Sequence, residues 1–425
     1  MVRKLFRNAH IYSPVDTGAP LAGTSQGQVA CLEQGAMLVC DGLIERIGTE
    51  QDVLADIDTL QIDEEVDCRG SCIIPGFVDP HTHMCFAVRR EAEFGLRLKG
   101  TSYLDILKAG GGILSSVNAV RRISDDDLLA ATLENALSAL RFGTTTLEIK
   151  SGYGLNTEIE LKMLSVIDRV SRMTPLDVVA TFMGAHAVPE EYRKAPEEYV
   201  DLLIREMIPA IRRQGIAKYC DVFCESGVFS VDQSRRILSA ASSAGFGLKI
   251  HADEVHDMGG AGLAAELRAV SAEHLLAASH VNIAGLATSG TIAVLLPGTA
   301  YSLQKPYARA RDMIAAGVPV AIATDCNPGS CFTESMPFVF GLSVMNMGLT
   351  PEEALTAATL NAAYSIGMAD RVGSLDQGKQ ADFLILDGRS PAILAYHAGV
   401  SPVVAVFKKG EKIITERNTR WNLRI

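Results

Sequence analysis

Between about residue 73 and residue 325 the chain repeats one pattern eight times: a short apolar run followed by a segment with the periodicity of an amphipathic helix. Apolar strands that alternate with helices are typical of parallel sheets, and eight such units close a (β/α)₈ barrel. The pattern therefore predicts a barrel over residues 76–372. The eight runs are 73–80, 144–150, 176–185, 219–225, 246–252, 269–275, 291–297 and 318–325.

The segments between these runs carry the signals of helix ends. In Ser124–Phe142, Ser124 suits the N-cap, the three aspartates that follow it suit the positive helix start, and Gly143 suits a left-handed end. Thr350–Glu353 is a capping box with proline at the first helical position, which predicts one helix to about Ile366.

Both ends of the chain read as short strands. In 36–48, Asp41-Gly42 separates two apolar runs and predicts a hairpin turn. Strand patterns return after residue 372, at 381–387 and 403–414. We expect residues 1–75 and 373–425 to pair into one small composite β domain.

Composition and charge exclude several classes of partner. A net charge of -11 and a pI near 5.4 argue against nucleic acid and anionic membranes, which both need a cationic face. The polar start, the absence of an apolar run of roughly 18 residues, and nine scattered cysteines without a Cys-x-x-Cys pair predict a cytoplasmic protein with reduced thiols. An anionic small substrate would need locally placed arginine or lysine.

Polar residues that are unusual in apolar runs gather at the ends of five of the eight predicted strands. Because the carboxyl ends of barrel strands form one rim, side chains far apart in the sequence would meet there. A lone His-x-His is usually an ordinary pair of side chains, whereas five strands with such endings favour a metal site. These endings are His81 and His83, His186, His251 and Glu254, Glu273 and His274, and Asp325.

The residue types at this rim suit hydrolysis with a bound metal. His81, His83, His251 and Asp325 offer three nitrogens and one oxygen to a divalent ion, which activates water. Glu254 lies three residues past a ligand and suits proton transfer, while His274 suits either polarising a carbonyl or holding the hydroxide. The fourth strand ends in Cys224-Glu-Ser226 without a lysine that could bridge two ions, so we expect one metal.

These motifs resemble the amidohydrolase superfamily of metal-dependent barrels, and in particular enzymes of that superfamily that open the cyclic amide of 4-imidazolone-5-propanoate. The most specific stretches are Lys-Ser-Gly-Tyr-Gly at 150–154 and Asp-x-Asn-Pro-Gly at 325–329. The resemblance implies a distorted (β/α)₈ TIM barrel with a small composite β-sandwich domain. It extends over Pro75–Phe86, Arg90-Glu91, Ala109–Ser115, Glu148–Gly154, Phe182–His186, Lys249–Glu254, Val270–His274 and Ala323–Ser330.

The resemblance also implies roles for individual residues. Arg90 matches the arginine that holds the substrate carboxylate, Tyr153 and His186 match residues that hold the ring and its side chain, and Glu254 matches the proton shuttle. Asn327, Gly329 and Ser330 match a product-contacting loop. It further implies one Zn²⁺ or Fe²⁺ ion and a homodimer.

Two departures from the family pattern flank the product loop. Cys326 stands where phenylalanine is common, and Cys331-Phe332 replaces a pair of small residues. Both concern the shape of the ring pocket and leave the metal ligands unchanged.

Two other functions compete with this hypothesis. A nucleobase deaminase of the same superfamily would use the same His-x-x-Glu and single metal, but a neutral base needs no arginine in the position of Arg90. A barrel that serves as an assembly or signalling module would not need the complete set of ligands, and its metal content would identify it.

Overall fold

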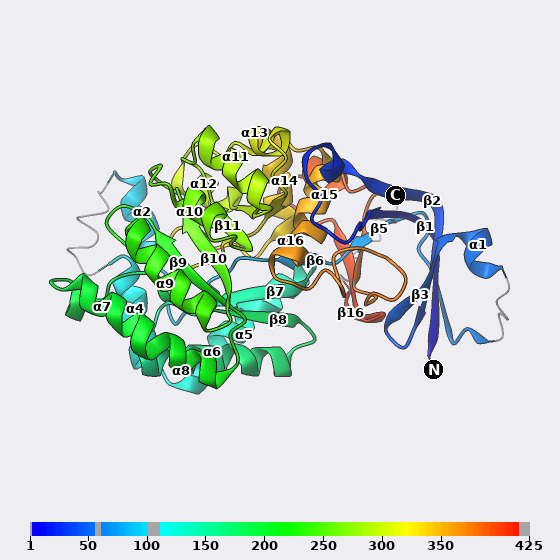
Figure 1. Cartoon of the computed structure of the whole chain (residues 1–425). Helices are drawn as coiled ribbons and strands as arrows, with labels where there is room; N and C mark the ends of the chain where they lie inside the picture. The colour runs from blue at the N-terminus through cyan, green and yellow to red at the C-terminus, as the bar shows by residue number, and fades with distance from the viewer. Residues whose placement is uncertain (1, 56–60, 101–110, 416–425) are drawn as a thin grey trace.

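The computed structural model describes residues 2–55, 61–100 and 111–415. Residues 109 and 110 of one resembling stretch, and the last ten residues of the predicted terminal segment, lie outside this part. The predicted combination of a (β/α)₈ barrel with a composite sheet is confirmed: one eight-stranded parallel sheet forms the barrel, and a second eight-stranded sheet combines both ends of the chain (Figure 1).

The barrel strands follow one another in chain order, each hydrogen-bonded in parallel to the next. All eight lie within the runs that the sequence predicts, because apolar side chains of parallel strands are covered on both faces. The strands are β6 (Phe77–Asp79), β7 (Thr144–Lys150), β8 (Asp177–Ala185), β9 (Tyr219–Cys224), β10 (Gly247–Ala252), β11 (Ser271–His274), β12 (Ile292–Leu295) and β13 (Val320–Ile322).

The prediction of a single first strand over 73–80 is wrong. The run divides at Gly76 into β5 (Cys72–Pro75), which belongs to the composite sheet, and β6, which belongs to the barrel. A Cβ on Gly76 would lie 2.3 Å from Oγ1 of Thr145, so only glycine lets the backbone pass from one sheet to the other here.

Side-chain and backbone contacts beyond the strand ends join β6 to β13. The Asp79 carboxylate accepts hydrogen bonds from the backbone N–H (3.1 Å) and the hydroxyl of Thr324. Farther along, Asp325 N donates to His81 O at 3.1 Å and His83 N donates to Cys326 O at 2.9 Å. The barrel is therefore held closed at the rim that carries the predicted metal ligands.

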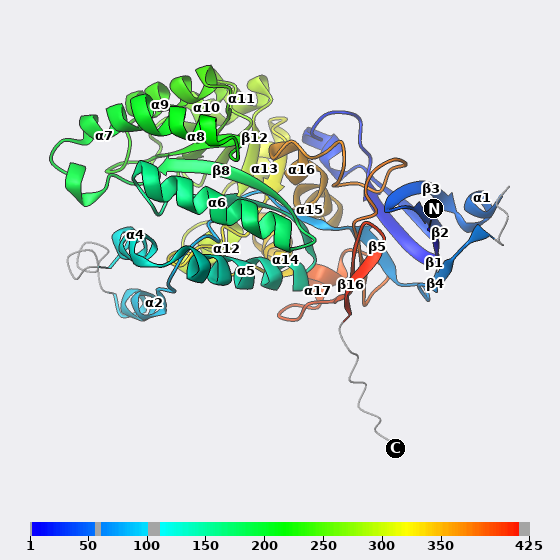
Figure 2. The ribbon, with the colours of Figure 1, turned by 90° about the horizontal axis from the view of Figure 1, so that it is seen from below.

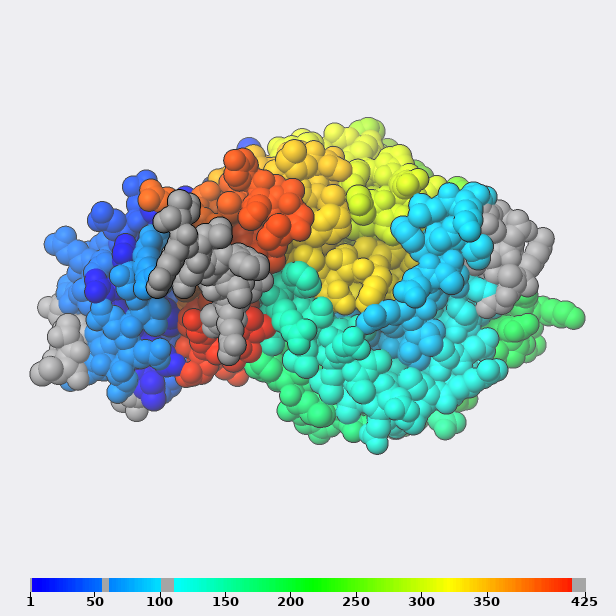
Figure 3. All heavy atoms as spheres, turned by 180° about the vertical axis from the view of Figure 1, so that it is seen from behind, coloured from blue at the N-terminus to red at the C-terminus, as the bar shows by residue number. Residues whose placement is uncertain are grey.

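Helices cover the outside of the barrel, as the views in Figures 1 and 2 show together. In the space-filling view of Figure 3, the barrel forms the larger part of the molecule and the composite sheet lies at one end. No helix among the described residues is long and apolar enough to cross a membrane. The helices are α1 (Glu50–Leu54), α2 (Glu91–Leu98), α4 (Ile113–Arg122), α5 (Asp125–Arg141), α6 (Thr157–Met173), α7 (Pro196–Leu202), α8 (Ile208–Gln214), α9 (Val231–Ser243), α10 (Gly260–Glu266), α11 (His280–Ser289), α12 (Pro297–Leu303), α13 (Ala310–Ala315), α14 (Met336–Met347), α15 (Pro351–Ala358), α16 (Leu360–Ser365) and α17 (Ile393–Tyr396), with short segments η1 (Gly23–Gly27), η3 (Glu190–Tyr192) and η4 (Leu203–Met207).

The predicted helix ends are largely correct. Ser124 caps α5 by accepting from Asp127 N, and Gly143 follows with a φ of 97°. Thr350 and Glu353 form the expected capping box. The single helix predicted from Thr350 to Ile366 is wrong, since the chain breaks at Thr359 into α15 and α16. Asn361 gives the reason: its side chain bonds to the backbone of Leu21 and to Val320 O, so tertiary contacts set the direction of α16.

The composite sheet has the strand order β16-β15-β14-β5-β1-β2-β3, with β4 also paired to β1. The predicted hairpin joins β2 to β3, and both turn residues, Asp41 and Gly42, have positive φ. Phe6, Phe383 and Phe407 pack together in its core, with ring centroids 4.4 to 5.1 Å apart. The strands are β1 (Arg3–Pro14), β2 (Val29–Cys40), β3 (Leu43–Thr49), β4 (Glu64–Asp67), β5 (Cys72–Pro75), β14 (Phe383–Leu386), β15 (Val403–Lys408) and β16 (Glu411–Thr415).

Candidate metal centre

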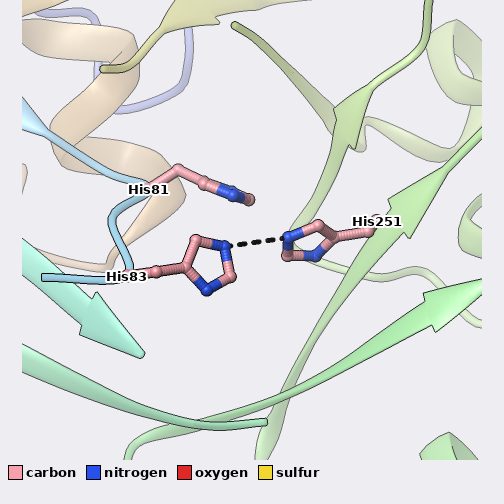
Figure 4. A group of neighbouring side chains, drawn as sticks. All are labelled: His81, His83 and His251. Atoms are coloured by element: carbon pink, nitrogen blue, oxygen red, sulfur yellow. Dashed lines mark hydrogen bonds between the residues drawn. The ribbon is translucent and has the colours of Figure 1, made fainter. Parts of the chain in front are cut away.

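Four predicted ligands meet at the carboxyl end of the barrel. His81 and His83 follow β6, His251 is in β10, and the three imidazoles face one another (Figure 4). The Nε2 atoms of His83 and His251 are 3.2 Å apart, and Oδ1 of Asp325 lies 3.5 Å from Nε2 of His81 and 3.6 Å from Nε2 of His83. Two ligands on one tetrahedral zinc ion are about 3.4 Å apart, since each bond is about 2.0 to 2.2 Å long. The spacing therefore fits one shared ion.

The electrostatics of the three imidazoles also suit a metal. Burial lowers the pKa of His81, His83 and His251 below the ordinary value, and neighbouring imidazoles and Lys150 lower each of them further, so the rings are neutral and able to coordinate. Both ring nitrogens of His81 and Nδ1 of His83 are buried without a hydrogen-bond partner. Unpaired buried polar atoms are costly. A divalent ion would take up Nε2 of His81, which faces Asp325, so the residues present fit such an ion.

Asp325 and His274 are held in an unusual backbone conformation. Their φ angles are 53° and 70°, in the left-handed region that side chains other than glycine rarely adopt. Such strain persists only where surrounding contacts enforce it, and it is common at functional sites. Asp325 also accepts a hydrogen bond from the hydroxyl of Thr299, while burial raises the pKa of Asp325 to about 6.

Glu254 and His274 lie together beside these ligands. Oε2 of Glu254 is 3.8 Å from Nε2 of His274. Burial, with a smaller contribution from the negative charge of Glu225, raises the pKa of Glu254 to about 7. Burial lowers the pKa of His274 and keeps that ring neutral. A carboxyl group that titrates near neutrality is suited to both accepting and donating a proton.

Glu225 holds the segment that carries Glu254, which the sequence pattern did not reveal. This buried carboxylate at the end of β9 accepts from Val255 N at 2.9 Å and His256 N at 3.3 Å, and it lies 2.9 Å from Nδ1 of His256. A glutamate next to a strand end could have suggested a role, but nothing in the sequence indicates that it would turn toward this loop.

Tyr153 and His186 form an aromatic wall beside the imidazole cluster. The His186 ring is stacked on His83 with centroids 4.9 Å apart, and Tyr153 lies 5.2 Å from His186. Nδ1 of His186 donates to Gly152 O at 3.0 Å, and burial lowers the pKa of His186 to about 4. Gly152 has a φ of 107°, and a Cβ there would lie 2.9 Å from Met183 O, so only glycine fits.

The loop that carries Tyr153 is held by a buried carboxylate, Glu160 of α6. Its oxygens accept from Gly152 N at 3.0 Å and from Gly154 N and Leu155 N at 2.8 Å each. The sequence does not predict a role for Glu160, because a glutamate in the first turn of a helix is normally exposed and only favours the helix start.

Arg90 lies next to the predicted product loop but is already paired. Its guanidinium donates to Glu93 at 3.0 and 2.7 Å and packs against Gly329, where a Cβ would come within 2.5 Å of Nη1. The Asn327 amide makes its bonds inside the loop: it accepts from Gly329 N and Ser330 N and donates to Asp325 O. Asn327 and Ser330 thus shape the loop, and Gly329 makes room for Arg90.

A cavity of about 590 Å³ adjoins this loop, and four of its five charged lining residues are basic. Arg89, Arg90, Arg97 and Lys305 line it, together with Glu91, Gly329 and apolar side chains, whereas none of the four metal ligands does. A second cavity of about 260 Å³ is lined by Glu254 and Thr299 and shares Lys305 with the first. The positive lining suits a small anionic compound in a protein of net negative charge.

The two departures from the family pattern lie at different depths. Cys331 lines the larger cavity, with its Sγ 3.4 Å from Thr324 O. Phe332 also lines it, and its ring lies 4.9 Å from the Arg89 guanidinium. Cys326 is fully buried and lines neither of these two cavities. Cys331 and Phe332 thus change the wall of the larger cavity, and Cys326 changes the packing behind it.

Comparison with known proteins defines the class to which this barrel and its histidine cluster belong. The sequence profile of the amidohydrolase family matches residues 72–413, which include the whole barrel. The chain therefore belongs to the amidohydrolase family.

Inside that family the chain is similar to proteins named imidazolonepropionase. The protein from Syntrophobacter fumaroxidans is 62% identical over 409 residues, 96% of each chain. The one from Desulfotalea psychrophila is 62% identical over 413 residues, 97% of this chain and 100% of that protein. Such identity over nearly the full length groups the chain with the imidazolonepropionases.

Solved structures that resemble this one share the fold at low sequence identity. A 5-methylcytosine deaminase from Klebsiella pneumoniae with phosphonocytosine has a TM-score of 0.72 at 16% identity and covers 97% of this chain and 98% of its own. An adenosine deaminase from Xanthomonas campestris with bound zinc has a TM-score of 0.70 at 18% identity and covers 98% and 94%. These likenesses support the barrel and the composite sheet alone.

Proposed function

We propose that the chain is an imidazolonepropionase, a hydrolase that opens the cyclic amide of 4-imidazolone-5-propanoate to N-formimidoyl-L-glutamate in histidine degradation. One observation carries the reaction type: three imidazole nitrogens and one carboxylate oxygen lie at ligand spacing beside a buried glutamate whose pKa is near neutrality. The substrate follows from relatives of that name, which are 62% identical to the chain.

The proposed cofactor is one divalent ion, Zn²⁺ or Fe²⁺. His81, His83, His251 and Asp325 would hold it through three nitrogens and one oxygen, a donor set that suits either ion. When bound, such an ion supplies Lewis acidity, which makes water a better nucleophile near neutral pH. The fourth barrel strand ends in Cys224, Glu225 and Ser226, without a lysine that could bridge a second ion.

Glu254 and His274 carry the proton chemistry in this proposal. As water adds to the amide carbonyl carbon, the Glu254 carboxylate takes one of its protons. Glu254 then passes that proton to the ring nitrogen as the carbon–nitrogen bond breaks, so the carboxylate is regenerated. The neutral His274 ring faces Glu254 and donates a hydrogen bond to the carbonyl oxygen, whose negative charge increases during the attack.

Arg90, Tyr153 and His186 hold the substrate in this proposal. Arg90 binds the propionate with its two-pronged guanidinium, which lies in the cationic cavity next to Gly329. The neutral rings of Tyr153 and His186 stack against the planar imidazolone. Asn327 and Ser330 support this arrangement by shaping the loop under Arg90.

The assay that tests the proposal follows the ultraviolet absorbance of 4-imidazolone-5-propanoate, with guanine and cytosine supplied in parallel to the purified metal-loaded protein. We expect the imidazolone absorbance to decay and no ammonia to form from either base. Ammonia release from a base without imidazolone consumption would instead support the deaminase alternative. Removal of the metal by a chelator should abolish the activity, and added Zn²⁺ or Fe²⁺ should restore it.

The homodimer and the cytoplasmic location remain predictions. The homodimer rests on the resemblance, and the cytoplasmic location rests on nine scattered cysteines without a Cys-x-x-Cys pair. Light scattering of the purified protein would measure the oligomeric state directly.

A further inference from the structure

Lys150 begins the Lys-Ser-Gly-Tyr-Gly motif, one of the two most specific in the sequence, and Glu148 lies two residues before it, yet the proposed reaction uses neither charged residue. Both lie on β7 and are fully buried. Buried charges are expensive unless they are paired, so a structure that keeps them needs a reason. Three further charged residues are fully buried on the consecutive barrel strands β9, β10 and β11. They are Asp221, Lys249 and Glu273.

On one side, Lys150 connects to the metal ligand His251. Nζ of Lys150 lies 2.9 Å from Oδ2 of Asp221, and Oδ1 of Asp221 lies 3.0 Å from Nδ1 of His251. A carboxylate can only accept a hydrogen bond, so Nδ1 carries the hydrogen and the lone pair is on Nε2. Nε2 is the atom that faces the other ligands.

On the other side, Lys150 connects to the His-Thr-His segment. Its Nζ donates to Oε1 of Glu148 at 2.8 Å, and Oε2 of Glu148 accepts from Thr82 N at 3.3 Å. Two further hydrogen bonds connect β7 to Thr82. The Thr82 hydroxyl donates to Glu148 O at 2.7 Å, and Lys150 N donates to Thr82 O at 3.0 Å. Thr82 is the residue between the ligands His81 and His83.

We propose that Lys150 is a positioning residue for the metal centre: through Asp221 and Glu148 it joins the His251 imidazole and the His81–His83 segment into one rigid frame. The inference rests on the metal site of the proposed function and extends it to residues that touch neither metal nor substrate. Partners of this kind fix the tautomer and orientation of a ligand, and their loss typically weakens metal binding about 10- to 100-fold.

The charge state of Lys150 agrees with this role. Burial lowers the pKa of the Lys150 ammonium, but the carboxylates of Asp221, Glu148 and Glu273 together outweigh burial and hold that pKa above its ordinary value. The ammonium also separates the Asp221 and Glu148 carboxylates, which would otherwise repel each other. A neutral side chain of similar length would fill the space without joining the two sides.

The test measures the affinity of the metal-free protein for Zn²⁺ by competition with a chromophoric chelator. Lys150→Met and Asp221→Asn should each weaken Zn²⁺ binding by about 10- to 100-fold. Lys408→Met is the matched control, because Lys408 is a buried lysine that also lies between two carboxylates, Asp177 and Asp382, but at the contact between the two sheets. It should change the affinity by less than about 3-fold, and circular dichroism should show that each variant is folded.

A double variant distinguishes a joint action from two separate losses. If Lys150 acts through Asp221, Lys150→Met combined with Asp221→Asn should weaken binding by much less than the product of the single effects. Asp221→Asn nearly preserves volume, so it tests the frame even where Lys150→Met does not fold. Wild-type affinity in both single variants would overturn the inference alone, as would an equal loss in Lys408→Met. A wild-type protein that binds no divalent ion would overturn the proposed function and this inference together.

Discussion

Single side chains at the barrel rim differ from their ordinary behaviour in water because burial changes which protonation state is favoured. The three imidazoles of the cluster are kept neutral, while Glu254 and Asp325 hold their protons to higher pH than exposed carboxyl groups do. Neutral imidazoles can coordinate a metal, and a carboxyl group that titrates near pH 7 can transfer protons. The chemistry of this site is thus set residue by residue through burial.

Glu254→Gln tests the proton transfer with little change in shape. The amide cannot accept and return a proton, so we expect kcat to fall at least about 100-fold, the lower range for general acid–base catalysis. Zn²⁺ content should stay at the wild-type level, because Glu254 is not among the proposed ligands. Steady-state kinetics and atomic absorption measure both quantities, and undiminished turnover would remove Glu254 from the mechanism.

The raised pKa of Glu254 predicts the direction of the pH dependence. The base is active when deprotonated, so kcat should be constant above pH 7 and fall about tenfold per unit below it, as the carboxylate takes up a proton. An exposed glutamate, with a pKa of about 4.3, would keep kcat constant down to about pH 5. The profile is measured between pH 5 and 9 at saturating metal and substrate, and a constant kcat down to pH 5 would contradict the assignment.

Arg90→Ala tests recognition of the propionate. A charge-assisted hydrogen bond contributes about 1.5 to 3 kcal/mol, so KM should rise roughly 10- to 100-fold while kcat changes by less than about 3-fold. Arg122→Ala is the control and should leave KM nearly unchanged, since Arg122 is exposed on α4 and lines neither of the two cavities. Glu93→Gln distinguishes direct binding of the propionate by Arg90 from a structural role of the Arg90–Glu93 ion pair. A comparable rise in KM in Glu93→Gln would mean that the pair only supports the fold.

At the scale of elements, buried carboxylates organise the loops that follow the strands. Glu160 of α6 holds the loop after β7, and Glu225 at the end of β9 holds the loop after β10. Backbone N–H groups in these loops have no strand partner and would be left unsatisfied without such acceptors. A carboxylate can accept several of them at once, which fixes a short loop without regular secondary structure.

Glu160→Gln should show the strength of this support. The amide retains only one oxygen acceptor, so at least one buried N–H of the loop loses its partner, and the free energy of unfolding should fall by about 1 to 3 kcal/mol. Glu158→Gln is the matched control, because Glu158 is exposed in the same first turn of α6, and its effect should stay within about 0.5 kcal/mol. Urea unfolding measures both variants; equal effects would show that Glu160 contributes only charge near the helix start.

At the scale of the whole molecule, the composite sheet and the barrel are joined by buried ion pairs as well as by the chain. Lys408 of β15 lies 2.6 Å from Asp382 and 2.6 Å from Asp177 of β8, a strand of the barrel. The run that passes from β5 to β6 through Gly76 continues from one sheet directly into the other. These connections leave no flexible linker between the two parts at this crossing.

Lys408→Met should destabilise both parts together. The substitution leaves the Asp177 and Asp382 carboxylates without their shared cation where the two sheets meet. Removal of one partner from a buried ion pair costs about 3 to 5 kcal/mol. Differential scanning calorimetry should show one transition at a lower Tm. Lys409→Met, at an exposed neighbouring position, should leave the Tm nearly unchanged. Two separate transitions in the wild-type protein would contradict the view that the parts unfold as one unit.

Much of the fold could be predicted because local patterns encode it. Apolar runs located all eight barrel strands, and the Asp41-Gly42 turn and the Ser124 cap were recognisable from residue type. The two errors, at Gly76 and Thr359, lie where long-range contacts override a continuous local pattern. Thr145 excludes a side chain at the first position, and the bonds of Asn361 to Leu21 and Val320 redirect the helix at the second.

The sequence by itself determined the kind of barrel and the residues that reach its rim, since strand periodicity and strand order follow from neighbouring residues. It did not determine which buried carboxylates support that rim. Asp221, Glu160 and Glu225 look ordinary in the sequence, and each acts on groups that become neighbours only when distant strands, loops and helices pack. Only the tertiary structure decided those pairings, because the strength of a buried charge contact depends on distance and on exclusion of water.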